Sequence, residues 1–175
     1  TWNHQNESYD IDDLQTRIEF ELRIGRLLTD RHGDHAKAEA HFRTAREILV
    51  KTQSVHGDLW TQVNSYLCIA LVRSNKLTES AKIIESEFSA ITYESYYQRW
   101  IRLYAQGLYE YHTSSDDSVQ TFSSALDALD DFRNSQLIPE LRLTFFREYS
   151  EIFEELVKIA TDLNNLGFTF KVIQI

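Results

Sequence analysis

The sequence has few residues that interrupt helices or cross-link a chain. Its 175 residues include five Gly, one Pro, one Cys and no Met. Because Gly and Pro are the strongest breakers of regular structure, their scarcity favours long helices over a sheet with many turns. One Cys excludes an internal disulfide, and the apolar neighbours of Cys68 predict a buried thiol. The absence of Met, with Thr1 in first position, suggests a processed product or a fragment of a longer protein.

Basic residues are also in the minority. Eighteen Lys and Arg against 27 Asp and Glu give a net charge of −9. Nucleic acids and anionic membranes attract basic surfaces, so we expect neither as a partner. The sequence shows no signal peptide and no apolar run of membrane length, and we therefore expect a cytoplasmic protein.

Apolar residues recur three or four positions apart along most of the chain, which is the period of a helix with one buried face. The sequence therefore predicts an all-α fold, with a polar arm over 1–10, helical repeats over 11–133 and a long closing helix and tail over 134–175. Pro139 suits the first turn of the closing helix, while the tail 168–175 permits either a helix or a short strand. The expected helices span 11–30, 35–51, 58–74, 78–91, 93–111, a segment carrying Phe122, Ala125 and Leu129, and 139–164.

The most informative feature is a spacing that occurs twice, 80 residues apart. Each copy has a small residue, a Phe four positions later and an Ala three positions after that. A degenerate copy lies between them, which gives a period of 37 to 43 residues. Such a period is typical of stacked helix pairs. The three copies are Ala38, Phe42 and Ala45; Ala81, Glu85 and Phe88; and Ser118, Phe122 and Ala125.

Residues 25–49 resemble a tetratricopeptide repeat, in which Gly25 takes the small position of the first helix. The distance from Gly25 to Ala38 is a residue longer than the family norm, which fits an extended turn at 31–34. The resemblance covers about residues 11–133 and implies a superhelical array of about three helix pairs with a concave groove. By the same resemblance, the two small positions are Ala70 and Ala81 in the second repeat, and Ala105 and Ser118 in the third.

The last 40 residues carry a narrower resemblance. The run 140–146, an amphipathic helix through Tyr149 and Leu156, and Gly167-Phe168 are similar to the segment that follows the repeats in TPR-CHAT proteins. In that family the repeats precede a caspase-like cysteine peptidase domain. The resemblance implies a regulatory repeat region, and no catalytic residue is carried over to this chain.

Chemical sites are weakly indicated. His32, His35 and His41 lie near Asp34, but His35 and His41 are six apart and face different sides of a helix, so we predict no zinc site. Asp10, Asp12 and Asp13 lack the Gly and the distal Glu of a calcium loop. No phosphate-binding loop, nucleophile elbow or dinucleotide fingerprint occurs. The sequence thus predicts no catalytic residue, metal or cofactor, and we do not expect an enzyme.

One set of residues supports a binding hypothesis. If Ala105 is the small position of the third repeat, Arg99 and Arg102 lie on the concave side of the fifth expected helix. Guanidinium groups suit a carboxylate or a peptide backbone. The alternative is that these arginines only pair with Glu94, Glu110 or other surface acids. The expected concave face comprises Glu19, Leu22, Arg26, Thr29, Asn64, Leu67, Leu71, Arg99, Arg102, Gln106 and Tyr109.

We therefore expect a protein–protein interaction scaffold whose groove receives a peptide or another domain of the same parent chain. The peptide that we expect is acidic or presents its C-terminal carboxylate. Two alternatives are a regulatory receptor for a short signalling peptide and a subunit of a helical-repeat assembly. The assembly would need an exposed apolar flank. The aromatic stretch 93–100 and the tail 168–175 are the candidates for that flank.

Overall fold

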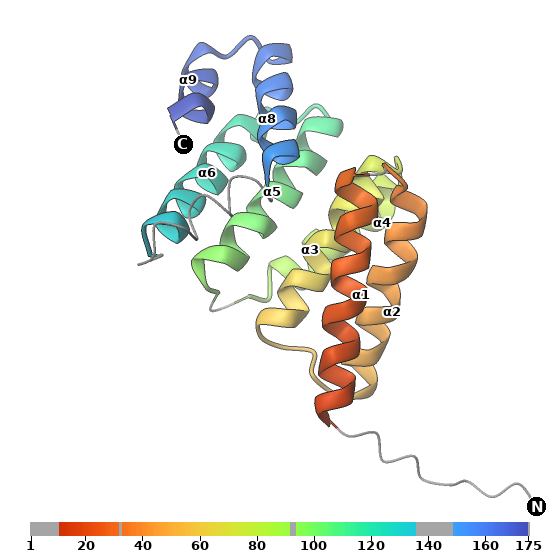
Figure 1. Ribbon diagram of the computed structural model, residues 1–175. Coiled ribbons are helices and arrows are strands. Elements are labelled where there is room, and N and C mark those ends of the chain that lie inside the picture. The colour runs from red at the N-terminus through yellow and green to blue at the C-terminus, as the bar shows by residue number, and fades with distance from the viewer. Residues whose placement is uncertain (1–10, 32, 92–93, 136–148, 175) are drawn as a thin grey trace, which may run out of the picture.

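The computed structural model describes residues 11–31, 33–91, 94–135 and 149–174, and within these ranges all regular structure is helical, as predicted (Figure 1). The polar arm 1–10 lies outside the described residues. The elements are α1 (Ile11–Arg31), α2 (His35–Lys51), α3 (Asp58–Arg73), α4 (Leu77–Ile83), the π-helix η1 (Ile84–Phe88), α5 (Tyr96–His112), α6 (Ser118–Ser135), α8 (Ser150–Asp162) and α9 (Leu166–Gln174).

Local chemistry sets several of the helix ends. The Asp34 carboxylate accepts a hydrogen bond from the Lys37 backbone at the start of α2. Ser95 and Gln98 form a reciprocal capping box at the start of α5, which satisfies two backbone N–H groups. Gly57 precedes α3 with a φ of 90°, a conformation that favours glycine. The turn predicted at 57–58 is therefore present.

The helices stack in chain order. α1 packs on α2, α2 on α3, α3 on α5, and α5 on α6, while α4 and η1 return along α3 (Figure 1). α8 and α9 pack against each other, and α9 also contacts α6. The described core is thus built from helix pairs in which each pair meets the next. No helix among the described residues is long and apolar enough to span a bilayer.

The first and last of the repeated spacings produce the same contact. A Cβ added to Gly25 would lie 2.4 Å from the ring of Phe42, and one added to Gly107 would lie 2.7 Å from the ring of Phe122. Both rings are fully buried. Gly107 therefore lies beneath Phe122 as Gly25 lies beneath Phe42. The predicted marker Ala105, two residues earlier on α5, is fully buried as well.

The second helix pair departs from the expected pattern. Ala81 is only half-buried and Glu85 is exposed, whereas Ser80 is fully buried. The chain then forms the π-helix η1, whose wider turn changes the phase of the side chains and buries Phe88. The small marker of this pair is therefore Ser80. If Ala81 were the small marker, Glu85 would take the aromatic position and place a charge between the helices.

The closing region differs from the single long helix that was expected. Tyr149 lies in a bend as the N-cap of α8, which begins at Ser150 and ends at Asp162. A continuous helix over 139–164 is therefore wrong, and Pro139 lies outside the described residues. The tail forms the helix α9, not a strand, and the Phe168 ring stacks on Phe122 with centroids 5.8 Å apart.

Candidate binding surface

Four side chains from four parts of the chain meet between the helix pairs. The Arg26 guanidinium of α1 lies over the rings of Tyr66 and Tyr149, 5.2 and 5.4 Å from their centroids. It also donates to the Tyr149 hydroxyl at 3.2 Å. The Tyr97 hydroxyl lies 3.0 Å from that of Tyr66 and accepts a hydrogen bond from that of Tyr149 at 3.1 Å. We call these residues the tyrosine cluster.

Two hydroxyl groups of the tyrosine cluster have a raised pKa. Burial raises the pKa of Tyr66 and of Tyr149 well above the usual value for a phenol, and the neighbouring Tyr97 adds to the effect. The hydroxyl groups therefore stay protonated, and they serve as hydrogen-bond partners instead of nucleophiles or bases.

A second group joins α8 to the helix pairs. Arg73 of α3 donates to the Glu155 carboxylate at 2.5 Å and to the Tyr104 hydroxyl at 3.2 Å, and Tyr104 itself donates to Glu155. His35 lies near this group, and its buried Nδ1 has no hydrogen-bond partner. Burial lowers the pKa of His35, and the positive charge of Arg73 acts in the same direction. We call these residues the charged cluster.

Much of the predicted concave face is inaccessible. The side chains of Leu22, Thr29, Asn64, Leu67 and Leu71 are all buried. The Asn64 amide is hydrogen-bonded to Arg46 and to the Trp60 carbonyl, so its polar atoms are satisfied within the chain. In this arrangement none of the five side chains can contact a partner.

The predicted arginines do not converge. Arg102 makes two hydrogen bonds to Glu94, at 2.6 and 2.8 Å, and the paired side chains are only 15% and 13% exposed. Arg102 lies five residues from Tyr97, which puts the two on opposite sides of α5. Arg26 belongs to the tyrosine cluster around Tyr97, so Arg26 and Arg102 do not face the same space.

The other members of the predicted face are more accessible. Arg99 and Glu19 are exposed, and Glu19 accepts a hydrogen bond from Gln15. Gln106 donates to Glu110 at 2.7 Å, and Tyr109 is half-buried. Of the three arginines proposed to bind an acidic partner, Arg99 is therefore the one whose side chain faces water.

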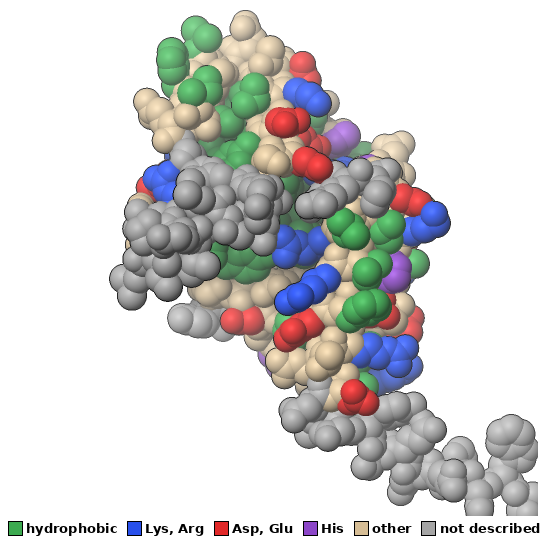
Figure 2. All heavy atoms as spheres, viewed as in Figure 1, with side chains coloured by type: hydrophobic (Ala, Val, Ile, Leu, Met, Phe, Trp, Pro, Cys, Tyr) green, Lys and Arg blue, Asp and Glu red, His purple; other side chains and the backbone are tan. Residues whose placement is uncertain are grey.

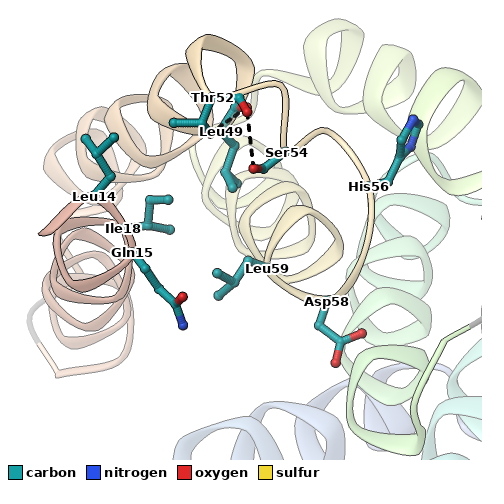
Figure 3. A pocket seen from close by; sticks show the side chains of 9 residues that line it. All are labelled: Leu14, Gln15, Ile18, Leu49, Thr52, Ser54, His56, Asp58 and Leu59. Carbon is teal, nitrogen blue, oxygen red and sulfur yellow. Dashed lines mark hydrogen bonds between the residues drawn. The ribbon is translucent and has the colours of Figure 1, made fainter. Parts of the chain in front are cut away.

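A pocket of about 350 Å³ opens between α1, the end of α2 and the start of α3 (Figure 3). Leu14 and Ile18 of α1, Leu49 of α2 and Leu59 of α3 point into the same space and form an apolar floor. Sequence reasoning missed this pocket because one wall is the irregular segment 52–57, which has no period. The polar lining residues are Gln15, Thr52, Ser54, His56 and Asp58.

The described residues that were considered for metal binding or nucleophilic chemistry are not arranged for either role. Within the described ranges no three His, Cys, Asp or Glu side chains are placed to hold a metal ion. His41 Nδ1 lies 2.6 Å from a Glu21 carboxylate oxygen, and His32 is outside those ranges. Cys68 is fully buried, and burial raises the pKa of its thiol to about 12. The thiolate form is therefore suppressed at neutral pH.

Comparison of the chain with models of protein families, with curated protein sequences and with solved structures gave no significant match. The resemblances to tetratricopeptide repeats and to TPR-CHAT proteins stay predictions.

Proposed function

We propose that this chain is a protein-interaction module that binds an extended peptide segment, carried either by another protein or by another domain of the parent chain. Stacked helix pairs align several helices side by side, and this gives repeat proteins extended binding surfaces. The observation that carries the proposal is the pocket between α1, α2 and α3, with its apolar floor and polar rim.

The composition of the pocket indicates the kind of segment that fits it. Its volume of about 350 Å³ is at the small end for ligand sites, and it suits one large apolar side chain. Gln15, Ser54 and His56 at the rim can exchange hydrogen bonds with the peptide groups on either side of that side chain. The partner we propose is a peptide with one anchor the size of Leu, Ile or Phe.

An acidic partner is a narrower form of the same proposal. It now depends on Arg99, because Arg26 contacts Tyr149 and Arg102 is paired with Glu94. Arg99 is exposed and lies in a chain with a net charge of −9. A peptide that also contacts Arg99 would carry an acidic residue.

Selection of peptides from a random displayed library with the full chain tests the proposal. The affinities of the selected peptides are then measured by fluorescence anisotropy for two variants. Gln15→Trp fills the pocket, whereas Asp13→Trp places the same ring at an exposed position of α1 that does not line it. We expect at least a tenfold loss of affinity, about 1.4 kcal/mol, with Gln15→Trp alone. Peptides that bind both variants equally well would exclude the pocket.

A further inference from the structure

One side of α9 carries three large apolar side chains that face water. Leu166, Phe170 and Ile173 are 73%, 64% and 67% exposed. Their spacing of four and three residues places them in one stripe. Phe168 and Val172, on the other side of the helix, are buried. Figure 2 shows hydrophobic side chains gathered over α9, and we call the exposed residues the α9 stripe.

α1 has a stripe with the same spacing. Phe20 and Leu27 are 58% and 41% exposed, and Ile24 between them is partly exposed. The stripe lies opposite the buried Leu22 on the helix, so it faces away from the core. Figure 2 shows hydrophobic side chains along α1 as well. We call these three residues the α1 stripe.

The charges beside the two stripes are opposite in sign. Arg17 and Arg23 are exposed on α1, each three residues from Phe20. On α8, which packs against α9, Glu151 and Glu154 are exposed, and Glu154 lies three residues from Val157, which is 40% exposed. Glu19 of α1 and Lys158 of α8 are exposed as well. Glu19 points about 100° away from Phe20 around the helix axis, and on α8 the exposed acids Glu151, Glu154 and Asp162 outnumber Lys158. The first surface is therefore apolar with two arginines beside it, and the second is apolar with a net acidic edge.

The opposite charges indicate that each of the two surfaces binds the other, on a second copy of the chain. A contact between two α1 stripes would bring Arg17 and Arg23 of both copies together, and a contact between two α9 stripes would do the same for the glutamates. Like charges facing each other oppose association, whereas opposite charges favour it. We propose that copies of this chain associate head to tail, with the α1 stripe of one copy packed against α8 and α9 of the next. This inference is independent of the peptide-binding proposal.

Sedimentation analysis of the full chain over a wide concentration range tests the association. We expect the average mass to rise above that of a monomer with concentration, because a head-to-tail contact leaves an open surface at each end. The double variants Phe20→Glu/Leu27→Glu and Phe170→Glu/Ile173→Glu should each stay monomeric. Val50→Glu, at a 51% exposed position of α2 outside both stripes, is the matched control and should associate like the wild type.

Mixing the two double variants distinguishes a head-to-tail contact from a symmetric one. Each variant keeps the surface that the other lacks, so an equimolar mixture should give dimers that grow no further. A wild type that stays monomeric up to its solubility limit would overturn the proposal. So would an α1-stripe variant that still dimerises alone, because that result would mean that α9 pairs with α9.

A charge exchange gives a test that leaves the apolar residues unchanged. Arg23→Glu should weaken association at least tenfold, and adding Glu154→Arg in the same chain should restore it, since each residue meets the other on the neighbouring copy. Both positions are exposed, so circular dichroism should show an unchanged fold. Failure of the second substitution to restore association would overturn the proposed pairing.

Discussion

Gly25 and Gly107 let the rings of Phe42 and Phe122 lie directly on the backbone of the facing helix. Both rings are completely buried. We expect Phe42→Ala and Phe122→Ala each to lower the free energy of unfolding by about 3–5 kcal/mol, because each removes a buried aromatic and leaves a cavity. Urea denaturation followed by circular dichroism measures the loss. An unchanged midpoint for Phe42→Ala would show that its ring does not hold α1 and α2 together.

The close approach of Gly107 and Phe122 has its own test. In Gly107→Ala the new methyl group overlaps the Phe122 ring, which is fixed among buried neighbours. We expect a loss of about 1–3 kcal/mol, the usual cost of overpacking. The double variant Gly107→Ala/Phe122→Leu should lose less than the sum of its parts. Additive losses in this cycle would place the contact elsewhere.

Arg99 and Arg102 looked equivalent in the sequence but differ in the structure. Arg102→Glu leaves Glu94 beside a second carboxylate in a mostly buried site, so we expect a loss of up to about 3 kcal/mol. Arg99→Glu changes an exposed side chain and should cost less than about 0.5 kcal/mol. Thermal unfolding of the two variants compares them. Equal melting temperatures would show that the pair with Glu94 contributes nothing.

Among the elements, α9 offers a comparison within a single helix. Phe168 is 2% exposed and stacks on Phe122, while Phe170 is 64% exposed. Phe168→Ala should therefore destabilise the protein by about 3–5 kcal/mol, whereas Phe170→Ala should have little effect. The measurement is the free energy of unfolding in urea. A similar loss from both substitutions would mean that α9 packs by another side.

The helices themselves could be read from the sequence because their signals are local. α2 occupies the predicted range 35–51, and Asp34 and the glycine before α3 act at the ends where turns were expected. Three other features were not predicted, because their causes are not local in the sequence. The π-helix after Ile83, the bend at Tyr149 and the use of Gly107 depend on contacts between helices, which a 3.6-residue period does not specify.

The candidate site was less predictable than the fold. Arg102 is paired with Glu94 and does not meet Arg26. The proposed flank 93–100 is exposed only in part, since Trp100 is completely buried while Tyr96 is 49% exposed. The tail was a better choice, because Phe170 and Ile173 do face water. Surfaces combine residues from several helices, so an error in one register changes the predicted surface more than the predicted helix.

At the scale of the whole molecule, the charged cluster makes stability depend on pH. Burial lowers the pKa of His35 from its reference value of 6.5. Below about pH 6.5, His35 is protonated to a greater extent in the unfolded chain than in the folded protein. The free energy of unfolding therefore has its full value above about pH 6.5 and falls as the pH is lowered. We expect a decline between about pH 7 and pH 5, measured by urea unfolding, that is smaller in His35→Gln.

The control for this prediction is His56→Gln, which changes an exposed histidine of the pocket rim. A smaller pH dependence of unfolding in His35→Gln than in His56→Gln would assign the effect to the charged cluster. If His35→Gln leaves that dependence unaltered, another group is responsible for it.

The hydrogen bonds of Tyr149 and Glu155 reach far back along the chain, to Arg26, 123 residues earlier, and to Arg73, 82 residues earlier. A linear array in which each unit touches only its neighbours can come apart one unit at a time. Here a pulling force applied at the two ends can detach α9 and the first turns of α1, but it meets these cross-connections before it reaches α2 to α6. The molecule should resist stretching until they break and then lengthen in one large step, because several helices are released together.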